Sequence, residues 1–137
     1  MTPAKAAAFV ARHKSAAEKL GLQAGSVFYA ANAPAELTKL LGAVPEGAQR
    51  ASAADGACTH FLVFARGSSE LVRALPQAKA ALAPGAALWV AFYKGVSGKS
   101  GDISRDMIRE HAMTLGLAAV SIVSLDADWS ALRLRPV

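Results

Sequence analysis

The chain has 137 residues, of which 53% are hydrophobic, and this is enough apolar material for one layered core. Fifteen Lys and Arg against ten Asp and Glu leave a formal net charge of +5, which predicts weak attraction to anions but identifies no partner. The single cysteine, Cys58, excludes an intramolecular disulfide and a cysteine-cluster zinc site, and no apolar run reaches the roughly 20 residues that span a membrane. We therefore expect one cytoplasmic domain over residues 1–137, with no membrane partner.

The first third of the chain predicts a helix, a strand and a second helix. Residues 4–20 combine high helix propensity with apolar residues at helical spacing, and Gly21 ends this N-terminal helix, which we expect to pack on the domain. Residues 26–31 are a short β-branched and aromatic run that favours a strand. Pro34 then suits the first position of a helix. The residues of this helix that we expect to face inward are Leu37, Leu40 and Leu41.

The middle of the chain predicts strands that are covered on both faces. Residues 60–65 and 87–93 are continuous apolar runs, whereas residues 48–53 form only a weak strand. Between the two buried strands, residues 70–82 read as a helix with a break or kink at Pro76.

The last part of the chain predicts one helix and two strands. Ser104 can cap a helix that runs to about Leu115, and residues 120–125 and 129–134 then form strands joined by a tight turn. Alternating helices and buried strands predict an α/β fold, a three-layer α/β/α sandwich with a mostly parallel, Rossmann-like sheet. The closing strand pair adds an antiparallel last strand.

Two segments carry a family resemblance. Leu-Gly-Leu-Gln-Ala-Gly-Ser-Val-Phe at residues 20–28 and Leu-Ala-Pro-Gly-Ala-Ala-Leu-Trp-Val at residues 82–90 precede or enter predicted strands. With the closing strand pair, they resemble class I S-adenosylmethionine-dependent methyltransferases over residues 20–135. The motif Asp-x-x-Trp-Ser-x-Leu-Arg at residues 126–133 resembles a narrower group of short uncharacterised bacterial methyltransferase-like proteins. This resemblance implies that the final strand inserts antiparallel into the sheet.

The chain departs from the methyltransferase pattern where the cofactor would bind. The resemblance calls for Gly-x-Gly-x-Gly after the first strand, but the sequence there contains Ala31, Asn32 and Ala33. Residues 48–53 contain no acid to hold ribose hydroxyls, and residues 53–59 are too few for the next strand and helix of the family. We therefore expect a degenerate, truncated fold without a cofactor.

The best candidate site in the sequence is the glycine-rich loop over residues 94–102. It follows a strand and precedes a helix, which places it at the carboxyl edge of the sheet, where open α/β folds bind ligands. Backbone N–H groups and two lysines could hold a small anion there, although a flexible solvated loop is the alternative. The candidate anion-binding residues are Lys94, Ser97, Gly98, Lys99, Ser100 and Arg105.

Other motifs favour structural roles. Gly98-Lys99-Ser100 matches the end of a nucleotide phosphate loop, but Tyr93 stands where that motif needs its first glycine. Arg105 and Arg109 are spaced to pair with acidic residues on one helix face. Their predicted partners are Asp102, Asp106 and Glu110.

The sequence predicts neither a catalytic residue nor a metal site. Three histidines are widely separated, and no serine lies in a hydrolase motif. Two tryptophans, Trp89 and Trp129, suit core or sheet-edge packing, and Cys58 suits a buried thiol.

Three functions follow from these patterns. We favour a non-catalytic methyltransferase-like module that binds a protein partner or a small anionic ligand. The first alternative is a methyltransferase that holds S-adenosylmethionine in an altered pose, with Asn32 near its methionine part. The second is a nucleic-acid-associated protein that uses its basic N-terminal helix.

Overall fold

The computed structural model describes residues 14–137. Most of the predicted N-terminal helix, residues 4–13, therefore lies outside the described residues. Within the described residues, the predicted continuous helix is wrong: residues 14 and 15 are not helical, and a separate short helix, α2, spans Ala16–Lys19. The interruption is a capping box, in which the Ser15 backbone is extended, the Ser15 hydroxyl accepts from the Glu18 N–H, and the Glu18 carboxylate accepts from the Ser15 N–H. Gly21 follows at a φ of 86°, so the helix ends where the sequence predicts.

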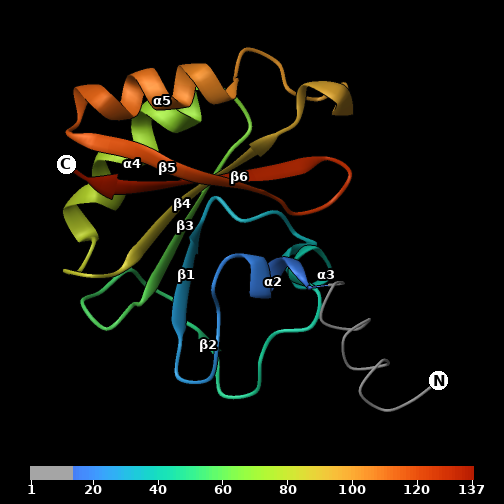
Figure 1. The fold of residues 1–137 in the computed structure, drawn as a ribbon, viewed down its shortest axis with the longest axis vertical. Coiled ribbons are helices and arrows are strands. Elements are labelled where there is room, and N and C mark those ends of the chain that lie inside the picture. The colour runs from blue at the N-terminus through green and yellow to red at the C-terminus, as the bar shows by residue number, and fades with distance from the viewer. Residues whose placement is uncertain (1–13) are drawn as a thin grey trace.

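Six strands form one sheet in the order β2-β1-β3-β4-β6-β5 (Figure 1). Strands β1 to β4 run parallel, whereas β6 runs antiparallel to both of its neighbours, β4 and β5. The predicted mostly parallel sheet with an antiparallel last strand is confirmed. The bounds are Val27–Ala31 for β1, Gln49–Arg50 for β2, His60–Ala65 for β3, Ala87–Tyr93 for β4, Leu117–Ser124 for β5 and Trp129–Pro136 for β6.

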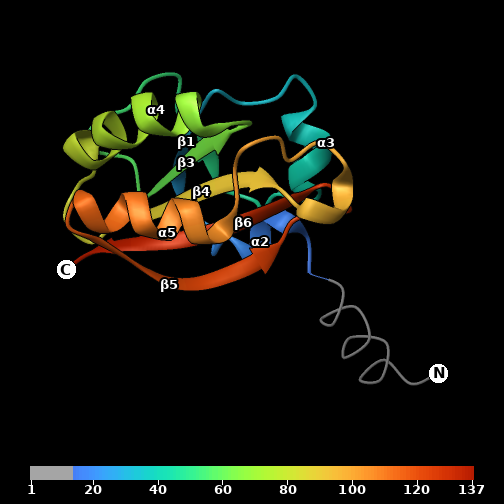
Figure 2. The same ribbon diagram turned by 90° about the horizontal axis from the view of Figure 1, so that it is seen from above.

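Helices cover both faces of the sheet. In β3, Leu62 and Phe64 pack in one cluster with the side chains of α2 and α3, while Phe61 and Val63 pack in a second cluster with those of α4 and α5. Figure 2 shows α4 and α5 lying side by side. Because successive side chains of β3 point to opposite faces of the sheet, this strand contributes to both cores of a three-layer sandwich. The bounds are Leu37–Leu41 for α3, Ser68–Ala81 for α4 and Arg105–Thr114 for α5.

Two predictions about proline are wrong. Pro34 lies before α3 and not at its first position: its carbonyl accepts from the Leu37 N–H, and the helix begins only at Leu37. Of the break or kink predicted at Pro76, the break is absent, because α4 continues through this residue. The carbonyl that loses its helical donor to this proline belongs to Val72, which lies on the solvent-exposed side of the helix.

The packing residues behave as the sequence predicts. Trp89, Trp129 and Cys58 are all buried. Ser104 caps α5 by accepting from the Met107 N–H. Among the described residues, no helix combines the length and the apolarity that crossing a membrane requires.

Replacing Leu75 with alanine tests the core on the α4 side. Leu75 is 0% exposed and lies in the second cluster, so Leu75→Ala should lower the free energy of unfolding by about 2 to 5 kcal/mol in a urea titration. Val72→Ala is the control on the same helix, because Val72 is 52% exposed and its truncation should change stability by less than about 0.5 kcal/mol. Equal losses in the two variants would contradict this packing.

Candidate functional site

The turn after β1 is the segment in which the resemblance to methyltransferases calls for a glycine-rich loop. Asn32 follows the strand with a φ of 57°, and it is the one non-glycine residue with positive φ in residues 14–137. Asparagine tolerates this left-handed conformation better than most residues do. The turn therefore keeps a glycine-like backbone at one position, while the side chains of Ala31 and Ala33 remain on either side of it.

The arginine that follows the neighbouring strand donates a hydrogen bond to this turn. Arg66 directly follows β3, and its Nη1 atom donates to the Asn32 carbonyl oxygen at 3.1 Å. Glu70 in α4 holds the arginine in place: one carboxylate oxygen accepts from the Arg66 backbone N–H at 2.7 Å, and the other lies 3.3 Å from Nη1. The carboxyl ends of β1 and β3 are thus joined by the protein's own side chains.

A carboxylate from the glycine-rich loop caps the N-terminus of α4. The N-cap of this helix is Gly67, which has no side chain to satisfy the first N–H groups. Asp102 takes this role from 34 residues away, accepting from the Ser68 N–H at 2.8 Å and from the Ser68 hydroxyl. The hydroxyl bond, followed by the N–H bond, holds the pKa of the Asp102 carboxyl below its ordinary value. The helix terminus that could attract an external anion already holds an internal one.

The second strand supplies no ribose-binding acid. β2 consists of Gln49 and Arg50 only. The first acid after β2, Asp55, accepts from the Ala57 N–H within its own loop at 2.8 Å. Residues 51–59 connect β2 to β3 without a helix or a strand, as the sequence predicts.

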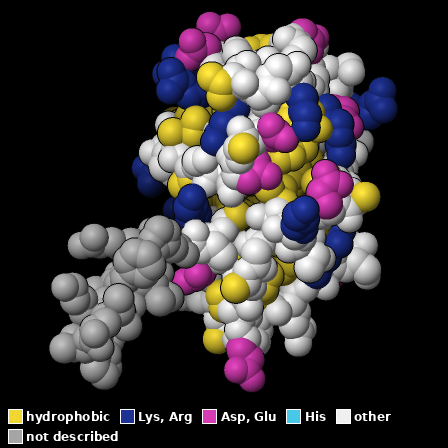
Figure 3. All heavy atoms as spheres, turned by 90° about the vertical axis from the view of Figure 1, so that its right-hand side faces the viewer, with side chains coloured by type: hydrophobic (Ala, Val, Ile, Leu, Met, Phe, Trp, Pro, Cys, Tyr) yellow, Lys and Arg dark blue, Asp and Glu magenta, His cyan; other side chains and the backbone are white. Residues whose placement is uncertain are grey.

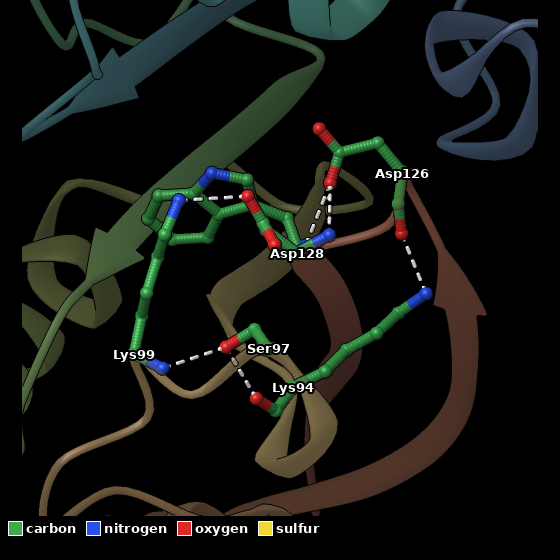
Figure 4. Close-up of polar contacts among 6 residues, drawn as sticks. Lys94, Ser97, Lys99, Asp126 and Asp128 are labelled. Carbon is green, nitrogen blue, oxygen red and sulfur yellow. Dashed lines mark hydrogen bonds and ion pairs between the residues drawn. The ribbon is translucent and has the colours of Figure 1, made fainter.

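The glycine-rich loop is internally ordered (Figure 4). Gly95–Ser97 form a short 3₁₀ helix, η1, and Gly98 follows at a φ of 77°. The Ser97 hydroxyl donates to the Lys94 carbonyl oxygen at 2.6 Å and accepts from the Lys99 N–H at 3.0 Å. This serine therefore holds the loop's own backbone.

The two lysines of the loop do not converge on one point. Lys94 Nζ donates to the Ser124 hydroxyl at 2.6 Å and to the Asp126 carbonyl oxygen at 2.5 Å. Lys99 Nζ lies 2.8 Å from an Asp128 carboxylate oxygen, and this bond, together with the Asp128 charge, raises the pKa of Lys99. Both lysines thus tie the loop to the turn between β5 and β6 (Figure 4).

The predicted anion-binding residues do not line one common groove. Lys94, Ser100 and Arg105 line a groove of about 460 Å³ together with residues of β4, β5 and β6. Lys99 lines a different groove of about 370 Å³, beside Asp126 and Asp128. Ser97 and Gly98 line neither of these two grooves.

Charges of both signs intermingle on this side of the molecule. Figure 3 shows Lys and Arg side chains interspersed with Asp and Glu, with no continuous basic patch on the face drawn. On α5, Asp106 contacts both Arg105, at 3.7 Å, and Arg109, at 3.0 Å. The predicted pairing with Asp102 is wrong, because that carboxylate caps α4 instead.

The sequence did not reveal which residues form the side-chain contacts at the carboxyl edge of the sheet. Arg66 and Glu70 belong to no motif, and Asp102, which ends the glycine-rich loop, was predicted to pair with arginines of α5 and not to cap α4. The one available signal was Gly67 before a helix, since a glycine N-cap leaves the first N–H groups without a side-chain acceptor. Within residues 14–137, no cluster of three His, Cys, Asp or Glu residues could hold a metal ion.

The Asp102 cap predicts a change in acid stability. Because hydrogen bonds in the folded protein lower the pKa of this carboxyl below 3.8, they stabilise the fold above that pH and are lost as the pH falls through the folded pKa. Asp102→Asn should therefore lower the unfolding midpoint at pH 7 and reduce the loss of stability between pH 4 and pH 2, as followed by circular dichroism.

The matched control is Asp106→Asn. Asp106 forms only exposed contacts with Arg105 and Arg109, so its replacement should have a smaller effect at pH 7. If Asp102→Asn and wild type lose the same stability in acid, the cap is not formed in solution.

Three comparisons with known proteins bear on these features. No curated protein matches the chain. The crystal structure of the B. subtilis M1A22 tRNA methyltransferase TrmK is similar, with a TM-score of 0.58 and 13% identity. The similarity covers 89% of this chain but only 64% of the methyltransferase chain, and at this identity it supports the fold alone. A family model matches residues 17–137, and the chain accordingly belongs to the family described as "Protein of unknown function (DUF3052)".

Proposed function

We propose that this protein is a non-catalytic binding module, with a methyltransferase-like fold whose cofactor edge has become structural. The observation that carries the proposal is the contact between Arg66 Nη1 and the Asn32 carbonyl oxygen at 3.1 Å. In a methyltransferase-like sheet, the cofactor lies above the turn that follows the first strand. Here a guanidinium held by Glu70 lies against that turn.

Three further features support the loss of the usual S-adenosylmethionine site. Methyl groups of Ala31 and Ala33 stand where glycines would let a cofactor approach the backbone. β2 ends without an acid for the ribose hydroxyls. The connection over residues 51–59 lacks the strand and helix that would form part of an adenine pocket. Each feature removes a different contact, so restoring one would leave the others missing.

The remaining candidate ligand at this edge is a small anion in the groove lined by Lys94, Ser100 and Arg105. Arg105 opens α5, so its charge adds to the positive end of the helix dipole. Its pairing with Asp106 is exposed and 3.7 Å long, which makes the pair weak and replaceable. Lys99 belongs to the second groove and already contacts Asp128. In the first groove, Lys94 Nζ likewise donates to Ser124 and to the Asp126 carbonyl oxygen, and Asp106 also lines the groove, so an anion there would compete with Asp106 for Arg105.

Calorimetric titration with S-adenosylmethionine tests the proposed loss. The wild-type protein should not bind, and the double variant Ala31→Gly with Ala33→Gly should not gain affinity, because Arg66 and the missing second-strand acid are unchanged. Micromolar binding by the wild type would support a methyltransferase with an altered cofactor pose. Binding only by the double variant would show that the two methyl groups alone were limiting.

Thermal unfolding in phosphate tests the anion groove. At phosphate concentrations about ten times Kd, the free energy of unfolding should rise by about 1.4 kcal/mol. Arg105→Gln should remove most of this gain. The control is Arg109→Gln, which also removes one arginine in contact with Asp106 but lies outside the groove. Equal losses in both variants would mean general charge screening and would overturn the anion site.

A further inference from the structure

The chain topology leaves one face of β1 without a covering helix. The connection from β1 to its neighbour β2 carries α3, which packs on one face of the sheet. The next connection returns across β1 to β3, so a right-handed crossover must pass over the opposite face, where α4 lies. That connection is residues 51–59, which contain no helix. The face of β1 beside α4 is therefore only partly covered.

A groove of about 400 Å³ lies at this place, and its size is that of a small-molecule site. Its floor is aromatic: the rings of Tyr29 and Phe61 meet edge to face, with centroids 5.1 Å apart and an angle of 80°. Its opposite wall is a row of alanines on α4, flanked by two longer polar side chains of the same helix, and a flat ring could lie between the aromatic floor and the alanines. The residues of this wall are Ala74, Ala78 and Ala81.

The polar residues of the groove are basic or neutral. Arg73 and Gln77 line it from α4, and Asn32 lines it from the end of β1, but no Asp or Glu does. Arg73 is exposed and has no ion pair or side-chain hydrogen bond within residues 14–137. An adjoining groove that shares Tyr29 contains a second arginine, Arg50, again without an acid. A negatively charged ligand would therefore complement the groove.

We propose that this groove binds a flat aromatic ring that carries a carboxylate. The ring would stack between Tyr29 and the alanine wall, and the carboxylate would accept two parallel hydrogen bonds from the Arg73 guanidinium. The site lies on the α4 face of β1 and is separate from the groove of Lys94 and Arg105, so it does not depend on the function proposed above.

NMR titration of the full chain with indole-3-acetate tests the proposal. The ¹H–¹⁵N shift changes should centre on Tyr29, Ala31, Ala74 and Gln77. The uncharged analogue indole-3-acetamide presents the same ring without the charge, so it should bind the same residues about tenfold more weakly. Absence of binding, equal affinity for the two compounds, or shift changes centred on the Arg105 groove would each overturn the proposal.

Two pairs of variants test separately the charge of Arg73 and the slot for the ring, which is the space between Tyr29 and the alanines of α4. Arg73→Gln should reduce the affinity for indole-3-acetate to that for the acetamide, whereas Arg109→Gln, an equal loss of charge on α5, should leave it unchanged. Ala74→Leu should fill the slot and abolish binding of both compounds. Its control is Ala80→Leu, which adds the same side chain at an exposed position of α4 outside the groove. Retained binding by Ala74→Leu, in a variant whose spectrum shows the native fold, would contradict the site.

Discussion

Burial of β3 and β4 on both faces is the interaction on which the rest of this structure depends. Leu62 and Phe64 face one cluster, while Val63 and Val90 face the other, and each is at most 1% exposed. These strands exclude water only if helices lie on both sides and a further strand continues the sheet beyond β4. β6 supplies that strand, pairing with β4 from Leu88 to Tyr93. The core thus requires the three layers of the sandwich but places no requirement on the carboxyl edge of the sheet.

In the proposed function, the carboxyl edge of the sheet receives no cofactor, and side chains of the protein itself hold its turns. Buried or half-buried polar groups still require partners, and here the chain provides them itself. Arg66 and Glu70 satisfy the turn after β1, and Asp102 satisfies the start of α4. Lys94 does the same for the turn between β5 and β6. The groove beside Tyr29 arises differently, from a connection too short to cover β1.

Regular elements could be predicted from the sequence because their signals are local. Apolar runs located β3 and β4, and Ser104 with Gly116 located the ends of α5. Predictions that depended on contacts between distant segments were less successful. The lysines of the glycine-rich loop suggested one concentrated positive site, but the β5–β6 turn brings Asp128 against Lys99 and a carbonyl against Lys94. No sequence spacing could have revealed that turn as their partner.

A crystal structure grown with millimolar S-adenosylmethionine would test the central claim most directly, since that claim concerns what lies above Asn32. We expect that Arg66 Nη1 remains within hydrogen-bonding distance of the Asn32 carbonyl oxygen, that Glu70 still contacts the guanidinium, and that no cofactor density appears over the turn. A structure in which Arg66 has moved away, with the methionine part of the cofactor against Asn32, would contradict it.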